Sequence, residues 1–152
     1  MADERDVTGP ILCLDPGAKR VGIAVSDPAL IAITAVAALH RSNWKQLLRD
    51  IQELIRHFDA RTLVIGFPLS LDGVEGSAAR EVRSMANKLA LSVDVPVFLH
   101  DERLTSVEAE ENLRERGFNR AEIDARIDSE AAAIILRDFI VAGQHRMPVA
   151  RH

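Results

Sequence analysis

A short apolar run near the start of the chain, ILCL at residues 11–14, ends directly in an acidic residue, Asp15. Continuous apolar character over such a run is typical of a central strand that is covered on both faces of a sheet. A Pro-Gly pair breaks the run, and the cations Lys19 and Arg20 follow at once. The stretch therefore predicts a buried strand that carries one carboxylate out of the core, next to two positive charges.

The first third of the chain is predicted to form strands, and the rest alternates helices with strands. Apolar residues spaced by three and four indicate helices, whereas alternation of large and small residues indicates strands. Asn119 with Glu122 fits a further helical start. A strand meander followed by strand–helix–strand crossovers predicts an α/β fold, a five-stranded mixed sheet with helices on both faces. The strands are expected at residues 11–14, 21–26, 33–39, 62–67 and 95–100, and the helices at 43–58, 77–92, 105–117 and 127–141.

The length of 152 residues fits one domain, predicted at residues 10–142 between a flexible N-terminus at 1–9 and a flexible tail at 143–152. No apolar stretch approaches the roughly 18 residues that a membrane span needs, and the charged start is not a signal peptide. The single Cys13 cannot form an internal disulfide, so a reduced, cytoplasmic setting is expected.

Carboxylates are expected to gather at one edge of the predicted sheet. The first, fourth and fifth strands would run parallel, so their C-terminal ends meet where open α/β sheets place their sites. Asp15 follows the first of these strands, and Glu102 or Asp101 follows the last. Asp128 opens the last predicted helix, and its neighbours three, four and seven positions on are apolar, so it should point toward the sheet.

Three acids at one edge favour a metal site. Two unit charges about 4 Å apart repel by roughly 4 kcal/mol at a surface-like dielectric, so either a proton or a hard cation must bind. Oxygen ligands with retained waters suit Mg²⁺ or Mn²⁺. Two such ions about 4 Å apart can activate a water and stabilise the leaving oxygen of a phosphodiester displacement. Asp15, Glu102 and Asp128 are therefore candidate metal ligands and catalytic residues of a nuclease.

Each acid also has a plainer explanation. Asp15 before Pro-Gly could merely start a turn. Glu102 and Asp101 could be solvated loop charges paired with Arg103. Asp128 could complement the helix dipole, which favours acids in the first turn of a helix.

The charge balance does not itself indicate nucleic-acid binding. The formal net charge is −4, whereas most nucleic-acid-binding domains carry a basic footprint. A bound divalent cation can meet phosphate where side chains do not. Basic residues also gather locally, at Lys19 and Arg20 and in the segment 114–126.

The loop that follows residues 62–67, PLSLDGVEG, is a candidate phosphate site. Gly73, Gly76 and the predicted helix start at Ser77 would suit an anion, because the amides of a first helical turn point at it. The same segment could also be only a connector.

Four segments in this order resemble the YqgF/RuvX family of bacterial proteins: LDPGAKRVGIAVSD, VIGFPLSLDGVEG, HDERLTSVEAE and DSEAAAIILRDFI. The resemblance covers residues 11–140. It implies an RNase H-like fold and metal-dependent nuclease chemistry, since the family is described both as a pre-16S ribosomal RNA nuclease and as a Holliday junction resolvase. It maps the strand-one acid onto Asp15, the acid of the DER segment onto Glu102 and the last-helix acid onto Asp128.

The resemblance also implies phosphate contacts from Lys19, Arg20 and Arg103, and a cytoplasmic role in maturing the 5′ end of small-subunit ribosomal RNA. Typical resolvases of this fold carry an acid at the end of the fourth strand, where this chain has GFP. Glu102 must therefore substitute from the fifth strand, with Asp72 as the alternative.

Three other functions stay open beside cleavage of precursor ribosomal RNA. A Holliday junction resolvase would cut branched DNA and would suggest a homodimer, because two strands must be cut symmetrically. A non-catalytic module would bind nucleic acid or a protein partner, but it would gain nothing from acids that repel phosphate. An actin-like ATPase shares the Gly-rich turn after a strand-one acid, but it needs two such domains.

Overall fold

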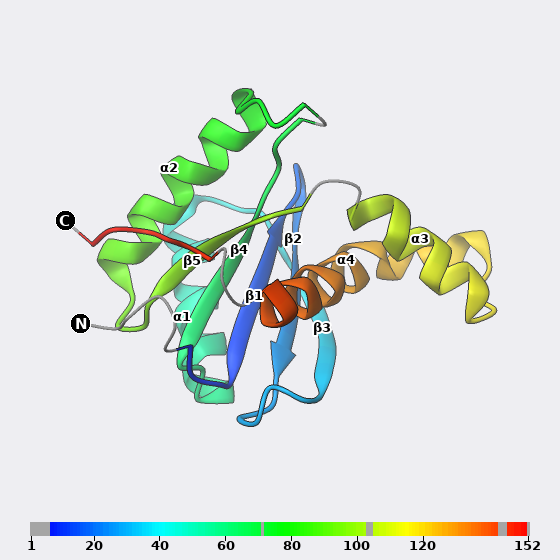
Figure 1. Ribbon diagram of the computed structural model, residues 1–152, viewed down its shortest axis with the longest axis horizontal. Coiled ribbons are helices and arrows are strands. Elements are labelled where there is room, and N and C mark those ends of the chain that lie inside the picture. Colours follow the sequence, from blue (N-terminus) through cyan, green and yellow to red (C-terminus); the bar gives the residue numbers. More distant parts are fainter. Residues whose placement is uncertain (1–6, 71, 103–104, 143–145, 152) are drawn as a thin grey trace.

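The computed structural model describes residues 7–70, 72–102, 105–142 and 146–151, and for residues 105–109, 124–129 and 142 it describes the backbone alone. The strands are β1 (Ile11–Pro16), β2 (Arg20–Ser26), β3 (Ile33–His40), β4 (Thr62–Phe67), β5 (Val97–Asp101) and β6 (Met147–Pro148). The helices are α1 (Trp44–Phe58), α2 (Ser77–Ser92), α3 (Thr105–Glu115) and α4 (Arg120–Ala142). Figure 1 shows the helices around one central sheet.

The sheet has the order β3-β2-β1-β4-β5-β6. β1, β4 and β5 run parallel, and β2, β3 and β6 pair antiparallel with their neighbours. The predicted mixed sheet with helices on both faces is thus confirmed. The count of five strands is wrong, because β6 adds a sixth beside β5.

β6 lies within the predicted tail at residues 143–152 and pairs with β5 through Met147 and Pro148. A two-residue strand that contains a proline gives almost no sequence signal, and proline is tolerated only because the strand lies at an edge. At the other end, residues 1–6 of the predicted N-terminal segment lie outside the described residues. No helix of the described residues is long and apolar enough to cross a membrane.

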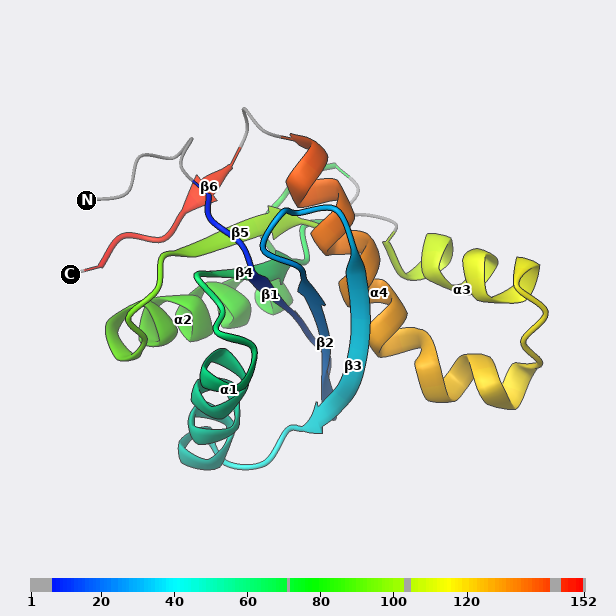
Figure 2. The ribbon, with the colours of Figure 1, turned by 90° about the horizontal axis from the view of Figure 1, so that it is seen from below.

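The two faces of the sheet bury different side chains of β1. Leu12 and Leu14 belong to the core shared with α1 and α2, whereas Ile11 and Cys13 pack with α4. Figure 2 shows α1 and α2 on one side of the sheet and α4 on the other. Because successive side chains of a strand alternate between faces, Asp15 lies on the α4 face.

α4 is one continuous helix of 23 residues, so the separate start predicted at residue 127 is wrong. No Gly or Pro interrupts the sequence between residues 120 and 127. The helix begins at the predicted capping box, in which the Asn119 amide donates to Glu122 (3.1 Å) and the Glu122 amide donates to the Asn119 side chain (2.9 Å). Asp128 therefore lies about two turns inside α4, and the first-turn dipole explanation does not apply to it.

α3 and the first part of α4 form a hairpin that projects from the sheet (Figure 1). Leu113 and Ile123 are buried between them. Glu130 of α4 is only 8% exposed and accepts hydrogen bonds from Asn112 (2.5 Å) and Arg116 (3.1 Å), both C-terminal in α3 or just beyond it. This buried carboxylate ties the two helices together.

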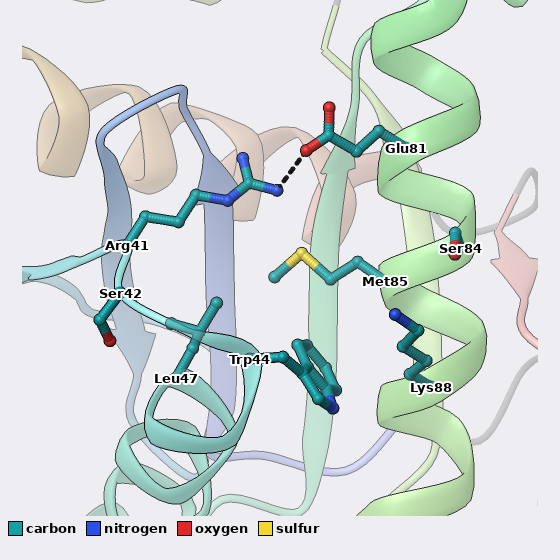
Figure 3. A pocket seen from close by; sticks show the side chains of 8 residues that line it. All are labelled: Arg41, Ser42, Trp44, Leu47, Glu81, Ser84, Met85 and Lys88. Carbon is teal, nitrogen blue, oxygen red and sulfur yellow. Dashed lines mark hydrogen bonds and ion pairs between the residues drawn. The ribbon is translucent and has the colours of Figure 1, made fainter.

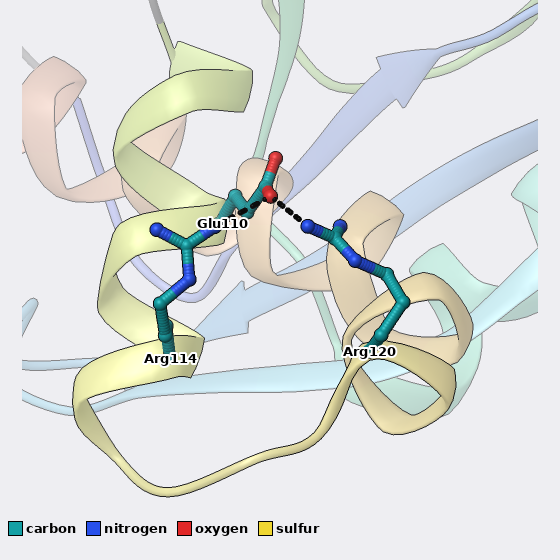
Figure 4. Close-up of polar contacts among 3 residues, drawn as sticks. All are labelled: Glu110, Arg114 and Arg120. Atoms are coloured by element: carbon teal, nitrogen blue, oxygen red, sulfur yellow. Dashed lines mark hydrogen bonds and ion pairs between the residues drawn. The ribbon is translucent and has the colours of Figure 1, made fainter.

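A second carboxylate closes the outer part of the hairpin. Glu110 accepts hydrogen bonds from Arg114 at 2.8 Å and from Arg120 at 2.6 Å, so that one acid joins α3 to the start of α4 (Figure 4). The two guanidinium groups lower the pKa of Glu110, with Arg120 as the larger cause. The basic segment 114–126 is therefore partly neutralised within the hairpin.

We expect Asn112→Ala to lower the free energy of unfolding by about 1–3 kcal/mol, because Glu130 Oε1 loses its donor in a buried position. Urea unfolding followed by far-UV circular dichroism measures the change. Asn87→Ala on the exposed side of α2 is the matched control, since it brings the same gain in helix propensity. Equal effects of the two substitutions would contradict the anchoring role of Glu130.

Candidate active site

The C-terminal ends of the parallel strands β1, β4 and β5 meet at one edge of the sheet, as predicted. Asp15 stands near the end of β1, where it pairs with Gly22 of β2. It is thus a residue of the strand ladder, and the plainer explanation as a turn starter does not hold. Glu102 follows β5 directly, and its amide donates to the carbonyl of Phe67 at 3.2 Å.

Glu102 reaches Asp15 across β4, the strand that separates them in the sheet. At the point of crossing, β4 carries Gly66, whose side chain position faces α4, as that of the buried Val64 does. A Cβ atom on Gly66 would collide with Glu102 Oε2 and would lie 2.8 Å from Cδ1 of Ile135 in α4. The missing side chain at Gly66 therefore provides the space in which the Glu102 carboxyl group lies.

The two carboxyl groups hydrogen-bond to each other, and this contact changes the protonation of Glu102. Burial, the hydrogen bond to Asp15 and the charges of Asp15 and Asp101 together raise the pKa of Glu102 to about 9, with burial as the largest cause. At neutral pH the protonated Glu102 therefore donates to Asp15. One proton holds together two groups that would otherwise repel each other.

The geometry separates Glu102 from the two alternatives for the second acid. Leu99 of β5 faces α1 and α2, so Asp101, two residues on, lies on that same face and away from the Asp15 side chain. Asp72 is engaged in its own loop, where it accepts hydrogen bonds from the Ser70 hydroxyl and from the Val74 amide. Glu102 is the acid that the fold brings to Asp15.

The third predicted acid, Asp128, belongs to the part of α4 for which the backbone alone is described. Ala131, Ala132 and Ile135, three, four and seven positions further along the helix, are all 2% exposed or less. Ile135 is also the α4 residue beside Gly66 and Glu102. Position 128 thus lies on the stripe of α4 that packs on the sheet, about two helical turns before Ile135.

The carboxyl pair is chemically suited to a divalent cation. Carboxylate oxygens are the ligands that Mg²⁺ and Mn²⁺ prefer, and two carboxyl groups close enough to share a proton are close enough to share an ion. Among the residues described with side chains, no group of three or more His, Cys, Asp or Glu forms a metal-binding cluster. The described part of the candidate site is therefore the pair Asp15 and Glu102.

The turn after Asp15 presents the predicted phosphate contacts Lys19 and Arg20 at the surface. The Gly17 amide donates to the Arg20 carbonyl at 2.8 Å, and a Cβ on Gly17 would lie equally close to that oxygen. Arg41, which follows β3, braces the turn: its Nη1 donates to Gly17 O (2.7 Å) and its amide to Lys19 O (2.9 Å). The role of Arg41 is not predictable from the sequence, because no local pattern links it to residues more than twenty positions away.

The loop between β4 and α2 satisfies much of its backbone internally. Gly73 has a φ of +83° and donates its amide to Ser70 O at 2.8 Å. Ser77 is the first residue of α2, and the N-cap Gly76 brings no side-chain acceptor to the first turn. Ser77 at the start of α2 thus remains a candidate anion contact. The Gly73 amide, in contrast, is already bonded within the loop. Arg103 lies outside the described residues.

Solved structures of resolvases share this fold. Thermus thermophilus RuvC in complex with a Holliday junction substrate aligns with a TM-score of 0.56 and 14% identity, covering 91% of this chain and 98% of that chain. The Fowlpox virus resolvase in complex with Holliday junction DNA aligns with a TM-score of 0.52 and 11% identity, covering 90% and 100%. The fold is therefore the RNase H-like fold of the resolvases, as predicted.

The sequence comparisons narrow the class to one family. The family model RuvX, described as "Holliday junction resolvase", matches residues 9–142, and the chain belongs to this family. A relative from Anaeromyxobacter sp. (strain Fw109-5) is 40% identical over 134 residues, which cover 88% of this chain and 97% of the relative. Another, from Maridesulfovibrio salexigens, is 38% identical over 130 residues, covering 86% and 96%. Both are named "Putative pre-16S rRNA nuclease". The predicted family membership is confirmed.

We expect the stability of the metal-free protein to fall as the pH rises from about 4.5 to about 9. In this range the folded chain holds the Glu102 proton, whereas the unfolded chain, with the ordinary value of 4.5, releases it. The slope approaches 1.4 kcal/mol per pH unit at most. Urea unfolding at a series of pH values measures it, and Glu102→Gln should flatten the profile and stabilise the protein at neutral pH.

Glu110→Gln provides the control for this profile, because the pKa of Glu110 is lowered and its titration lies below this pH range. It should leave the slope above pH 5 as in the parent protein. If Glu102→Gln and the parent protein lose stability at the same rate between pH 5 and 9, the shared proton is not held as described.

We expect Gly66→Ala to destabilise the fold by about 1–3 kcal/mol, because the added methyl group overlaps Glu102 and Ile135 in a packed region. Chemical unfolding in chelator-containing buffer at pH 6, where Glu102 is protonated, measures the loss. At Gly76 a Cβ atom would meet nothing within 4 Å, so Gly76→Ala should cost only what a poorer N-cap costs, about 1 kcal/mol or less. An unchanged stability of Gly66→Ala would show that the gap over β4 is not filled.

Proposed function

We propose that this chain is a divalent-metal-dependent nuclease that hydrolyses phosphodiester bonds in the 5′-end maturation of pre-16S ribosomal RNA, acting in the cytoplasm. The observation that carries the proposal is the contact between Asp15 and Glu102 across Gly66. Two carboxyl groups held together in a half-buried position lower the stability of the folded protein. Such a destabilising arrangement is typical of a functional site, and a catalytic cation site explains it. In a module that only binds nucleic acid, these two acids would weaken binding, because they repel phosphate.

Asp15 and Glu102, with Asp128 from α4, are the residues that would hold Mg²⁺ or Mn²⁺, with two ions as the proposed number. When bound, the ions supply an activated water and stabilise the leaving oxygen. Glu102 must first release its proton, so that both carboxylates can serve as oxygen donors. The pair therefore exchanges a shared proton for a cation.

The surrounding basic residues orient the substrate in this proposal. Lys19 and Arg20 are exposed on the turn that follows Asp15, and they are proposed to contact the phosphate that the carboxylates act on. Arg103 follows Glu102 directly in the chain and is proposed as a further phosphate contact. Ser77, at the start of α2, is proposed to contact a phosphate further along the strand, whereas the amide of Gly73, the other predicted contact, already donates to Ser70 O.

The comparisons favour ribosomal RNA over branched DNA as the substrate. The relatives at about 40% identity are named for pre-16S rRNA, whereas the resolvases that were solved with junction DNA share only 11–14% of the sequence. The family description supports the second candidate, a Holliday junction resolvase, which would act as a homodimer.

Cleavage assays on the purified chain test both candidates under identical conditions. A labelled precursor ribosomal RNA fragment and a four-way DNA junction are each incubated with Mg²⁺, Mn²⁺ or a chelator. We expect metal-dependent cleavage of the RNA, and a loss of at least about 100-fold in Asp15→Asn, because several kcal/mol of transition-state stabilisation depend on the metal site.

Asp94→Asn is the matched control, because Asp94 is an exposed residue just before β5, at the opposite end of the sheet. It should cleave like the parent protein. Paired symmetrical cuts in the junction, with the RNA left intact, would favour the resolvase. No cleavage of either substrate with any of the cations would contradict the nuclease proposal.

A further inference from the structure

A cavity of about 310 Å³ lies on the other face of the sheet, between the segment that joins β3 to α1, the start of α1 and the side of α2 that faces α1 (Figure 3). Leu47 and Met85, which are 3% and 6% exposed, form part of its apolar lining. Trp44 stands beside them, and Arg41, Glu81 and Lys88 are its charged residues. We call it the Trp44 pocket.

The pocket combines an aromatic ring with positive charge. Trp44 packs against the main core, and the Lys88 ammonium group lies over its indole ring, 5.4 Å from the ring centroid. Aromatic faces beside cations are the elements with which proteins hold single-stranded nucleic acid, because the base stacks on the ring and the phosphate meets the cation. An apolar interior with a few charged groups is also typical of ligand pockets.

The Trp44 pocket adjoins the candidate active site through Arg41. The Arg41 guanidinium donates to Gly17 O (2.7 Å) in the turn after Asp15, and it pairs with Glu81 of α2 (2.7 Å). The Arg41 amide donates to the carbonyl of Lys19. The basic turn and the pocket are thus joined by direct hydrogen bonds through Arg41.

We infer that the Trp44 pocket binds one unpaired nucleotide of the substrate strand, with the base stacked on the Trp44 indole and its phosphate held by Lys88. This inference rests on the proposed nuclease function, which supplies a nucleic-acid strand at the neighbouring turn. Lys88 moves from the ring to the phosphate as the base enters. The volume lies at the lower end of the roughly 300–1,000 Å³ of ligand pockets, so it fits a single base and excludes a duplex.

The chain reports on this pocket directly, because Trp44 is its single tryptophan and it has no tyrosine. Full-length protein, with divalent cations chelated so that no strand is cut, is titrated with single-stranded RNA, with DNA of the same sequence and with duplex RNA. We expect saturable quenching of Trp44 emission by the single strands, with the dissociation constant that fluorescence polarisation of a labelled strand gives. Quenching by RNA alone or by both single strands supports the inference, and equal quenching by the duplex overturns it.

Substitutions identify the groups, with binding read from polarisation. Trp44→Leu keeps an apolar side chain on the core but removes stacking, so we expect binding about tenfold weaker, and Trp44→Phe should restore most of it. Lys88→Gln should weaken binding several-fold and lower the salt dependence by about one ion. Lys45→Gln, an exposed lysine outside the pocket with the same change in net charge, should bind within about twofold of the parent protein.

The outcomes separate this inference from the nuclease proposal. Cleavage of RNA without any change in Trp44 emission on binding would overturn the pocket and leave the nuclease standing. Quenching that is weakened by Lys88→Gln but not by Lys45→Gln, without cleavage of any substrate, would support the pocket and contradict the nuclease proposal. If circular dichroism shows that Trp44→Leu does not fold, the comparison of Lys88→Gln with Lys45→Gln still tests the inference. Equal binding by these two variants would contradict it.

Discussion

Asp15 and Glu102 meet across a strand to which neither belongs, and the chemistry of this sheet edge depends on that contact. Two charges about 4 Å apart repel by roughly 4 kcal/mol at a surface-like dielectric. The pair is therefore stable only when a positive charge, either a proton or a metal cation, lies between its oxygens. Without metal this positive charge is a proton, which Glu102 keeps because burial and the neighbouring Asp15 raise its pKa to about 9. Gly66 makes the contact possible, because any side chain there would occupy the space of the Glu102 carboxyl group.

The sheet delivers this pair by simple alternation. Along β1 the leucines face α1 and α2, so Asp15 shares its face with Cys13 and lies under α4. On the neighbouring β2 the residues that face α4 are small, Gly22, Ala24 and Ser26, and Ser26 accepts the Ile11 amide at 2.8 Å. These small side chains let the long helix α4 pack closely on the sheet. Ile135 of α4 thereby lies beside Gly66, next to the carboxyl pair.

Local patterns in the sequence predicted local structure well and tertiary contacts poorly. The helix at 77–92 and the capping pair Asn119 and Glu122 were found because spacing and cap chemistry are written in neighbouring residues. β6 was missed because two edge residues carry no pattern of their own. The roles of Gly66 and Arg41 can be recognised only once the strand order is known. In the sequence, GFP shows only that the fourth strand does not end in an acid. Arg41 acts on a turn that is far away in the sequence.

The net charge of −4 is a poor guide to this protein because the charges are segregated. Arg114 and Arg120 are bound to Glu110 in the α3–α4 hairpin, and their charge stabilises that hairpin. Lys19 and Arg41 instead stand at the turn between the carboxyl pair on one face of the sheet and the Trp44 pocket on the other. A phosphate chain laid over this turn would meet the exposed cation Lys19 beside the carboxyl pair, where a metal ion would receive it. Nucleic-acid recognition then depends on the order of charges along one strand path, which a sum over the sequence averages away.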